Sequence, residues 1–262
     1  MPKLSVLFLG PAGSGKTLLT WAFGKWLENS GFTVDYVNLD PAVEDLPYKP
    51  DVDVRDYVDA RDIMRKTGLG PNGALLASVD MLLLNIEDIK EEVWSLRSNY
   101  IVIDTPGQME IFAFRPTGPM VLRALVGDAK AVTLFLVDST FASSPLNLLS
   151  ALLLSASTYA RIGYPQINVL TKIDLLEPGQ LEKTLEMLEN PEELAGSIMS
   201  ERPARLIWDE YEIETIAEKL TVFETVPVSN LSGEGFDDLY AAIQRVVAGG
   251  EDYYTEEPSP RL

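Results

Sequence analysis

The residues Gly10 to Thr17 constrain this 262-residue chain more than any other stretch. They read Gly-Pro-Ala-Gly-Ser-Gly-Lys-Thr and fit the pattern G-x-x-x-x-G-K-[ST]. An apolar run at 4–9 precedes them, and residues 18–27 repeat apolar side chains at helical spacing. In this strand–loop–helix context the pattern predicts a phosphate-binding loop (P-loop), whose backbone amides and helix N-terminus surround a polyphosphate.

The polar side chains of this loop have expected partners. Lys16 would reach the β- and γ-phosphates, and the Thr17 hydroxyl would ligate Mg²⁺. Backbone amides would supply the remaining contacts to phosphate. The predicted nucleotide-binding residues of the loop are Gly10, Gly13, Ser14, Gly15, Lys16, Thr17 and Leu18.

The composition excludes several kinds of chemistry. The chain has no Cys and no His, so disulfides, thiol catalysis, His-ligated zinc and Ser-His-Asp triads are ruled out, which leaves carboxylates, Lys, Arg, amides, backbone and a hard metal. The net charge of −19 argues against direct nucleic-acid binding and suits a basic partner surface. No leader-like segment follows Met1 and no apolar run is long enough to span a bilayer, so a cytoplasmic protein without a membrane partner is expected.

Strand-like and helix-like patterns alternate along the chain. Apolar residues make up 46 % of it, which is enough to bury a core. Strand patterns occupy 33–39, 100–103, 131–137, 167–170 and 221–228, and helical patterns occupy 18–29, 52–66, 74–86, 87–96, 145–163 and 236–247. This alternation predicts an α/β protein with a three-layer P-loop NTPase fold and a mostly parallel central sheet.

The predicted organisation is one domain over 1–248 with additions. A polar, acidic segment at 178–220 is expected to form a helical insertion at one edge of the sheet. The tail at 249–262 is acidic and contains proline, which predicts disorder.

Two further strand ends carry carboxylates. The carboxyl ends of parallel strands share one edge of the sheet, where ligands bind. Asp40 follows the second strand and is held there by Pro41. Asp104 begins a D-x-x-G motif, in which it would hold a water near Mg²⁺ while Gly107 offers its N–H to the γ-phosphate. The expected metal site is therefore made of Thr17, Asp40 and Asp104.

The stretch Thr171-Lys172-Ile173-Asp174 resembles the guanine-recognition element of GTPases, [NT]-K-x-D. Guanine presents two adjacent donors, N1–H and the exocyclic amine, to a carboxylate, whereas adenine has no N1–H. Asp174 would therefore select guanine, with the Lys172 stem against the base, and the expected ligands are GTP and GDP. Thr171 replaces the commoner Asn, which affects a secondary contact. Ser229 and Asn230 resemble the last base-contacting loop of GTPases, where a backbone N–H meets guanine O6.

Gly70-Pro71-Asn72 completes an ordered set of motifs. The P-loop, an Asp-Pro after the second strand, this tripeptide, D-T-P-G-Q and T-K-x-D follow one another as in the GPN-loop GTPases, which the chain resembles over about 3–247. The resemblance implies a dimeric P-loop GTPase, here a homodimer, in which Asn72 of one subunit meets the γ-phosphate bound by the other, in the place of an arginine finger. Pro11 stands where related dimeric ATPases carry an extra lysine. Eukaryotic relatives are associated with RNA polymerase assembly, so a protein client of that kind is implied.

The group that orients the attacking water is left open among Asp40, Gln108 and Glu110. Asp40 has the strand-end position, and Gln108 directly follows D-x-x-G, where an amide can orient water without acting as a base. Glu110 would also favour a first helical turn regardless of function. Three functions stay open: a GTP-hydrolysing switch for a protein client, a P-loop kinase with a small acceptor, and a nucleotide-stabilised scaffold with negligible turnover. The kinase hypothesis leaves T-K-x-D unexplained.

Overall fold

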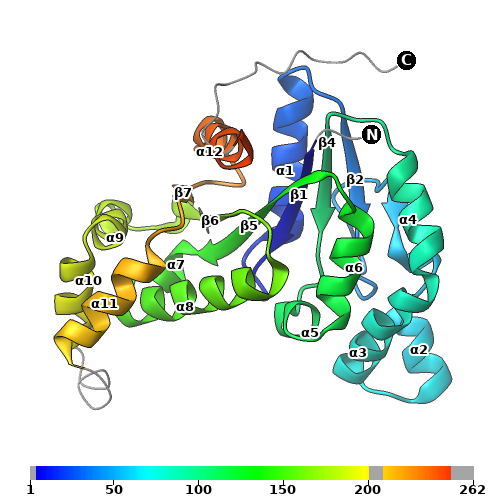
Figure 1. Ribbon diagram of the computed structural model, residues 1–262, viewed down its shortest axis with the longest axis horizontal. Helices are drawn as coiled ribbons and strands as arrows, with labels where there is room; N and C mark the ends of the chain where they lie inside the picture. The colour runs from blue at the N-terminus through cyan, green and yellow to red at the C-terminus, as the bar shows by residue number, and fades with distance from the viewer. Residues whose placement is uncertain (1–3, 201–208, 249–262) are drawn as a thin grey trace.

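The computed structural model describes residues 4–200 and 209–248. Seven strands form one sheet, in the spatial order β3-β2-β4-β1-β5-β6-β7 (Figure 1). Their bounds are Leu4–Leu9 (β1), Val34–Asn38 (β2), Val52–Asp53 (β3), Tyr100–Asp104 (β4), Lys130–Asp138 (β5), Gln166–Thr171 (β6) and Thr225–Pro227 (β7). All neighbouring pairs run parallel. The predicted three-layer α/β fold is confirmed, with a fully rather than mostly parallel sheet among the described residues.

Helices cover both faces of the sheet (Figure 1). They are α1 (Lys16–Asn29), α2 (Ala60–Thr67), α3 (Pro71–Leu82), α4 (Ile86–Ser95), α5 (Met109–Ala113), α6 (Thr117–Val126), α7 (Ser139–Ala142), α8 (Pro145–Ile162), α9 (Gln180–Glu189), α10 (Pro191–Met199), α11 (Glu210–Leu220) and α12 (Phe236–Ala248), with short 3-10 turns η1 (Val54–Asp56), η2 (Leu83–Asn85) and η3 (Ile173–Leu175). The core on one face is completed by α1 and α12, and the core on the other by α4, α6 and α8.

The central strand explains why the P-loop occupies the middle of the sheet edge. All six residues of β1 are buried, because a parallel sheet is covered on both faces and its strands read as continuous apolar runs. Leu7 belongs to one core cluster and Phe8 to the other. The register pairs Phe8 with Asp104 of β4 and Leu9 with Phe135 of β5. The loop that follows β1 is therefore flanked by the ends of both neighbouring strands.

Two stretches differ from the elements expected of them. The predicted helix at 52–66 begins as β3, because Val52 and Asp53 pair with the end of β2, and Asp53 then caps η1 by accepting a hydrogen bond from the Arg55 amide. Residues 109–126, where the sequence suggested no more than a first helical turn at Glu110, form α5 and α6. These two helices approach closely at Gly118, where an added Cβ would lie 1.9 Å from the Phe112 carbonyl oxygen. That approach depends on glycine at position 118.

The segment at 178–220 contains α9, α10 and α11 (Figure 1). Leu194 and Ile198 of α10 and Ile213 and Ala217 of α11 are buried in the same core cluster as α8. The division into one domain with an insertion stays a prediction, and 201–208 and the tail at 249–262 lie outside the described residues. Within the described ranges, no helix combines the length and apolar character that crossing a bilayer requires.

Candidate functional site

The P-loop adopts a backbone that glycine alone tolerates well. Gly10, Gly13 and Gly15 all have positive φ angles, of 151°, 79° and 91°. An added Cβ at Gly10 would lie 2.6 Å from the Leu136 carbonyl oxygen, and one at Gly15 would lie 2.9 Å from Asn230 Nδ2. Helix α1 starts directly after Gly15, and no side chain caps its first turn. The N-terminus of α1 therefore has the amides and the dipole direction that bind an anion.

Lys16 connects this loop to the D-x-x-G segment. Its side chain is 5% exposed, and Nζ donates to the carbonyl oxygens of Gly10 (2.8 Å), Pro11 (2.9 Å) and Gly107 (3.3 Å). Burial lowers the pKa of Lys16, while the charges of Asp104 and Asp40 act in the opposite direction. The ammonium therefore lies between the two loops that were expected to hold the β- and γ-phosphates.

Asp104, at the end of β4, is a buried carboxylate that is only partly satisfied. It is 1% exposed, and burial raises its pKa from 3.8 to about 6. Oδ2 accepts a hydrogen bond from the Tyr48 hydroxyl at 3.1 Å, whereas Oδ1 is buried with no hydrogen bond of normal geometry. The Thr17 hydroxyl is near enough to oppose the rise in pKa. Asp104 Oδ1, a buried carboxylate oxygen that accepts no hydrogen bond of normal geometry, and the nearby Thr17 hydroxyl are both oxygen ligands of the kind that a hard cation prefers.

A magnesium ion at this position would take part of its ligand shell from outside the protein. No group of three or more acidic, His or Cys side chains that could hold a metal occurs in 4–200 or 209–248. Mg²⁺ often keeps several waters and binds through one or two carboxylates plus substrate phosphates. Thr17 and Asp104 therefore suit an ion that arrives with a nucleotide.

The raised pKa of Asp104 predicts a pH-dependent stability difference. Asp104 stays protonated up to about pH 6 in the folded protein but only up to about pH 3.8 in the unfolded chain. Proton binding by Asp104 therefore stabilises the folded protein below pH 3.8, and this stabilisation is lost as the pH rises to about 6. In chelator-containing buffer, the free energy of unfolding of wild type minus that of Asp104→Asn should fall by about 2 kcal/mol between pH 4 and pH 7. Urea titrations at four pH values measure it. A difference that stays constant with pH would contradict the assignment.

Asp40 contacts the D-x-x-G segment directly. Its Oδ2 accepts the Gly107 N–H at 3.0 Å, and Oδ1 accepts the Ala42 N–H at 2.8 Å. Burial raises the pKa of Asp40, and these two amides act against the rise. The amide that was expected to meet the γ-phosphate is thus bonded to Asp40, which places this carboxylate at the predicted reaction centre.

The tripeptide Gly70-Pro71-Asn72 lies at the start of α3 and is exposed. Pro71 is the first helical residue and Gly70 the N-cap, an arrangement that favours helix initiation. Asn72 Oδ1 accepts a hydrogen bond from Gln108 Nε2 of the same chain at 3.0 Å. Glu110 is exposed in the first turn of α5, as expected for helix-favouring chemistry. The structure therefore brings Asn72 to Gln108 within one chain.

A second contact ties α3 to the segment after D-x-x-G-Q. Asp80 of α3 accepts hydrogen bonds from the Thr117 hydroxyl at 2.7 Å and from Arg115 Nη2 at 2.8 Å. Sequence reasoning gave no role to this trio, because residues 80 and 115 are far apart in the chain and each is an ordinary surface residue type. The trio links the orientation of α3 to the start of α6.

The predicted guanine-recognition residues also meet the P-loop. The buried Thr171 hydroxyl donates to the Ser14 carbonyl oxygen at 2.8 Å, which gives this threonine a structural contact. Asn230 Nδ2 donates to the Gly15 carbonyl oxygen at 3.2 Å. Both strand-end loops are therefore fixed to the P-loop by side-chain hydrogen bonds.

Asp174 and Lys172 are held in defined orientations. Asp174 is exposed, and its Oδ1 accepts the Ser229 hydroxyl at 2.7 Å. Lys172 has a φ of 63°, in the left-handed region, and its Nζ pairs with Asp138 Oδ2 at 2.7 Å. Strained backbone at such a position is typical of functional sites. Asp138 fixes the Lys172 ammonium and was not singled out from the sequence, although its place at the end of β5 was a usable signal.

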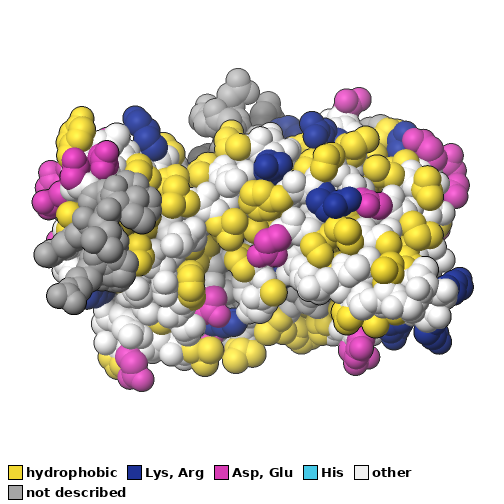
Figure 2. All heavy atoms as spheres, turned by 90° about the horizontal axis from the view of Figure 1, so that it is seen from below, with side chains coloured by type: hydrophobic (Ala, Val, Ile, Leu, Met, Phe, Trp, Pro, Cys, Tyr) yellow, Lys and Arg dark blue, Asp and Glu magenta, His cyan; other side chains and the backbone are white. Residues whose placement is uncertain are grey.

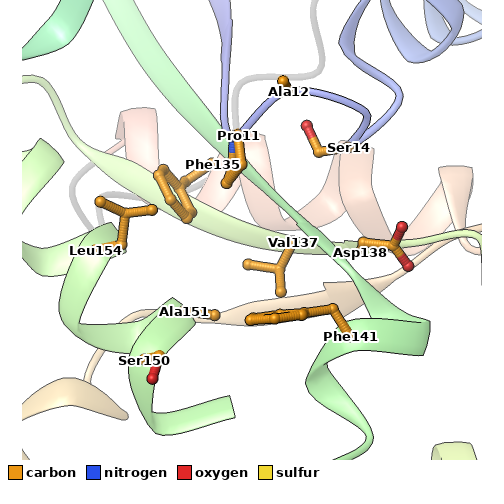
Figure 3. Close-up of a pocket in the computed structure, with 10 residues that line it drawn as sticks. All are labelled: Pro11, Ala12, Ser14, Phe135, Val137, Asp138, Phe141, Ser150, Ala151 and Leu154. Carbon is orange, nitrogen blue, oxygen red and sulfur yellow. The ribbon is translucent and has the colours of Figure 1, made fainter. Parts of the chain in front are cut away.

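A separate cavity of about 450 Å³ borders the P-loop on the α8 side (Figure 3). Phe141 of α7 and Leu154 of α8 face Pro11 and Val137 across it, and its walls are mostly apolar (Figure 3). No Lys or Arg lines it. A polyphosphate needs cations or amides, so the phosphates belong on the Lys16 side of the loop rather than in this cavity.

Comparisons with known proteins match this arrangement. The family model described as "Conserved hypothetical ATP binding protein" matches residues 8–249. A GPN-loop GTPase of Pyrococcus abyssi is 33% identical over 236 residues, which is 89% of this chain and 93% of that protein. A protein named GPN-loop GTPase 3 from Dictyostelium discoideum is 31% identical over 98% of this chain and 92% of its own length.

A solved structure agrees with the sequence matches. The crystal structure of the apo form of a GTPase from Pyrococcus abyssi superposes with a TM-score of 0.81 at 32% identity, covering 93% of this chain and 97% of that one. With these identities and this coverage, the chain belongs to the GPN-loop GTPase family.

Proposed function

We propose that this protein binds GTP with Mg²⁺, hydrolyses it to GDP and phosphate, and works as a homodimeric switch on a protein client. One observation carries the catalytic part: three strand-end loops are hydrogen-bonded to the P-loop. Lys16 reaches the Gly107 carbonyl, Thr171 reaches Ser14, and Asn230 reaches Gly15. Residues suited to phosphate, to a cation and to guanine therefore surround one P-loop.

At the phosphate end, the polar groups can change partners when a triphosphate binds. Lys16 would exchange carbonyl oxygens for β- and γ-phosphate oxygens, a charge-assisted contact that is stronger than a neutral one. The Gly107 amide would pass from Asp40 to the γ-phosphate, which frees the Asp40 carboxylate to orient a water. Mg²⁺, held by Thr17 and Asp104, would neutralise charge that develops on the phosphates. Gln108 is the second candidate for orienting the water.

At the base end, Asp174 decides between guanine and adenine. Its Oδ1 already accepts one hydrogen bond from Ser229, which restricts the orientation of the carboxylate. Adenine would leave this carboxylate without its N1–H donor. We therefore propose GTP rather than ATP as the ligand, although the matching family model carries ATP in its description.

The test of this function is binding and single-turnover hydrolysis by the purified protein. With Mg²⁺, GTP is expected to bind about 10²-fold more tightly than ATP, because a site built for a hydrogen bond rejects the analogue that lacks it. Excess protein should then convert γ-labelled GTP to GDP and free phosphate. Equal affinity for ATP would refute the guanine assignment. Transfer of the label to an added acceptor would favour a kinase, and no turnover at all would favour a scaffold.

The homodimer is supported by the surface and by the loop. Figure 2 shows hydrophobic side chains spread across the face on which α5 and α8 lie, with isolated charges between them. Large exposed apolar residues include Leu69 between α2 and α3, Phe141 of α7 and Leu153 of α8. Broad apolar surface of this kind marks interaction sites. Asn72 is exposed as well, so it is available to a second subunit.

The Asn72–Gln108 bond raises an alternative role within the same subunit. A cis role would have Asn72 orient the Gln108 amide, whereas the trans role expected from the family resemblance would have it meet the γ-phosphate of the partner. The trans role is favoured because Pro11 leaves the loop without a cation of its own at that position. The client is proposed from resemblance to belong to RNA polymerase assembly, and a pull-down that compares GDP-loaded with GTP-analogue-loaded protein tests it.

A further inference from the structure

The loop between β2 and β3 places one aromatic hydroxyl at the predicted cation site. Tyr48 is 8% exposed although it lies in a segment with no regular secondary structure. Its ring stacks on Tyr36 of β2, with centroids 5.0 Å apart and planes inclined by 28°. Its hydroxyl donates to Asp104 Oδ2 at 3.1 Å, across 56 residues of chain. A buried tyrosine thus connects a surface loop to a carboxylate at the reaction centre.

The loop is anchored on both sides of Tyr48. Before it, Arg55 Nη1 donates to the carbonyl oxygens of Val43 and Glu44, each at 3.1 Å. After it, Asp51 Oδ2 accepts the Tyr36 amide at 2.9 Å. Together with the ring stack, these contacts fix where the Tyr48 hydroxyl can lie. A group fixed in this way is suited to orient a neighbouring ligand atom.

The two oxygens of Asp104 have different surroundings. Oδ2 is taken by Tyr48, and Oδ1 is buried with no hydrogen bond of normal geometry. A carboxylate that is free to rotate could exchange these oxygens, whereas one held at Oδ2 keeps Oδ1 available. Partners that orient a ligating carboxylate commonly change metal affinity 10- to 100-fold when they are removed.

We propose that Tyr48 is a positioning residue for the cation: its hydroxyl holds Asp104 Oδ2, so that Oδ1 is left for Mg²⁺. This inference rests on the proposed function, since it assumes a guanine nucleotide bound with Mg²⁺. Tyr48 does not touch the nucleotide or the reacting atoms in this assignment. It acts through Asp104, and its removal should change the Mg²⁺ requirement rather than the contacts to the base.

The test compares Tyr48→Phe with wild type and with Tyr36→Phe. The Tyr36 hydroxyl lies against Gly24 of α1, so the control removes a hydroxyl from the other ring of the same stack. Each protein is loaded with fluorescent GDP, and its release is followed at stepped free Mg²⁺ concentrations and in EDTA. Tyr48→Phe should need about 10-fold more Mg²⁺ for half-maximal slowing of release. Its release rate in EDTA should equal that of wild type, and Tyr36→Phe should behave as wild type throughout.

Each other outcome overturns the proposal in a recognisable way. An unchanged Mg²⁺ midpoint in Tyr48→Phe would make the hydroxyl merely structural, and faster release in EDTA would place its effect on the nucleotide instead. A wild type that binds no GDP, or whose release ignores Mg²⁺, would refute the proposed function itself. A double-mutant cycle is completed by adding Tyr48→Phe to Asp104→Asn. In that background Tyr48→Phe should cause no further shift of the Mg²⁺ concentration that half-maximally slows GDP release. An undiminished shift there would show that Tyr48 does not act through Asp104.

Discussion

Replacing Asp174 with asparagine is expected to weaken GTP binding by about 10²- to 10³-fold, or 3–4 kcal/mol, and to create binding of xanthosine triphosphate. The carboxylate would accept both guanine donors, whereas the asparagine amide presents one acceptor and one donor. Xanthine has N1–H next to a carbonyl oxygen, which matches that amide. Ser229 donates to Asp174 Oδ1 and can equally donate to an amide oxygen, so the local geometry should survive. Calorimetric titration with both nucleotides measures the exchange.

The gain of xanthosine triphosphate binding separates a change in specificity from misfolding. Asp174→Ala serves as the control, because it removes both acceptors and should lose GTP without gaining xanthosine triphosphate. Asp174 is exposed, so neither change creates a core cavity. If Asp174→Asn kept its preference for guanine, the base would have to be recognised elsewhere, and the T-K-x-D assignment would be wrong.

The features of this protein that could be predicted are those encoded by short, contiguous sequence motifs. The P-loop, D-x-x-G and T-K-x-D each follow a strand whose apolar run is unmistakable, so their place at one sheet edge could be inferred before any coordinates. The positive φ angles of Gly10 and Gly15 and the position of Lys16 agree with that inference. Local sequence is enough here because a parallel sheet brings every strand's carboxyl end to the same side.

The missed residues depend on contacts between distant segments. Tyr48 reaches Asp104, and Asp138 pairs with Lys172 only because β5 and β6 are neighbours. The trio of Asp80, Arg115 and Thr117 joins α3 to α6 in the same way. Only Asp138 has a local signal, its place at the end of a strand, and nothing along the chain pairs it with Lys172. Predicting which of these distant residues pair requires knowledge of the strand order, and residue spacing along the chain does not give that order.

The structure gives Asn72 a second candidate role. The family resemblance assigns it to the partner's γ-phosphate, whereas its hydrogen bond to Gln108 lies within one chain. Either role predicts that Asn72→Ala slows GTP turnover by about 10²- to 10³-fold while leaving binding intact, as the loss of one preorganised donor at a reaction centre does. Single variants therefore cannot separate the two roles, and a mixed dimer is needed.

A heterodimer of Asn72→Ala with Asp174→Asn makes the two roles predict opposite results. The Asn72→Ala subunit binds GTP, and the Asp174→Asn subunit binds xanthosine triphosphate and carries the intact Asn72. If Asn72 acts in trans, bound GTP is hydrolysed at a rate close to wild type and bound xanthosine triphosphate is not. If it acts in cis through Gln108, xanthosine triphosphate is hydrolysed and GTP is not. The heterodimer is purified through different tags on the two subunits and is given both nucleotides, with the γ-label on one nucleotide at a time. Release of labelled phosphate then identifies the nucleotide that is hydrolysed. In a two-fold dimer each subunit offers its Asn72 to the other subunit's site. We therefore expect GTP to be the nucleotide consumed, and xanthosine triphosphate turnover would refute the cross-subunit role.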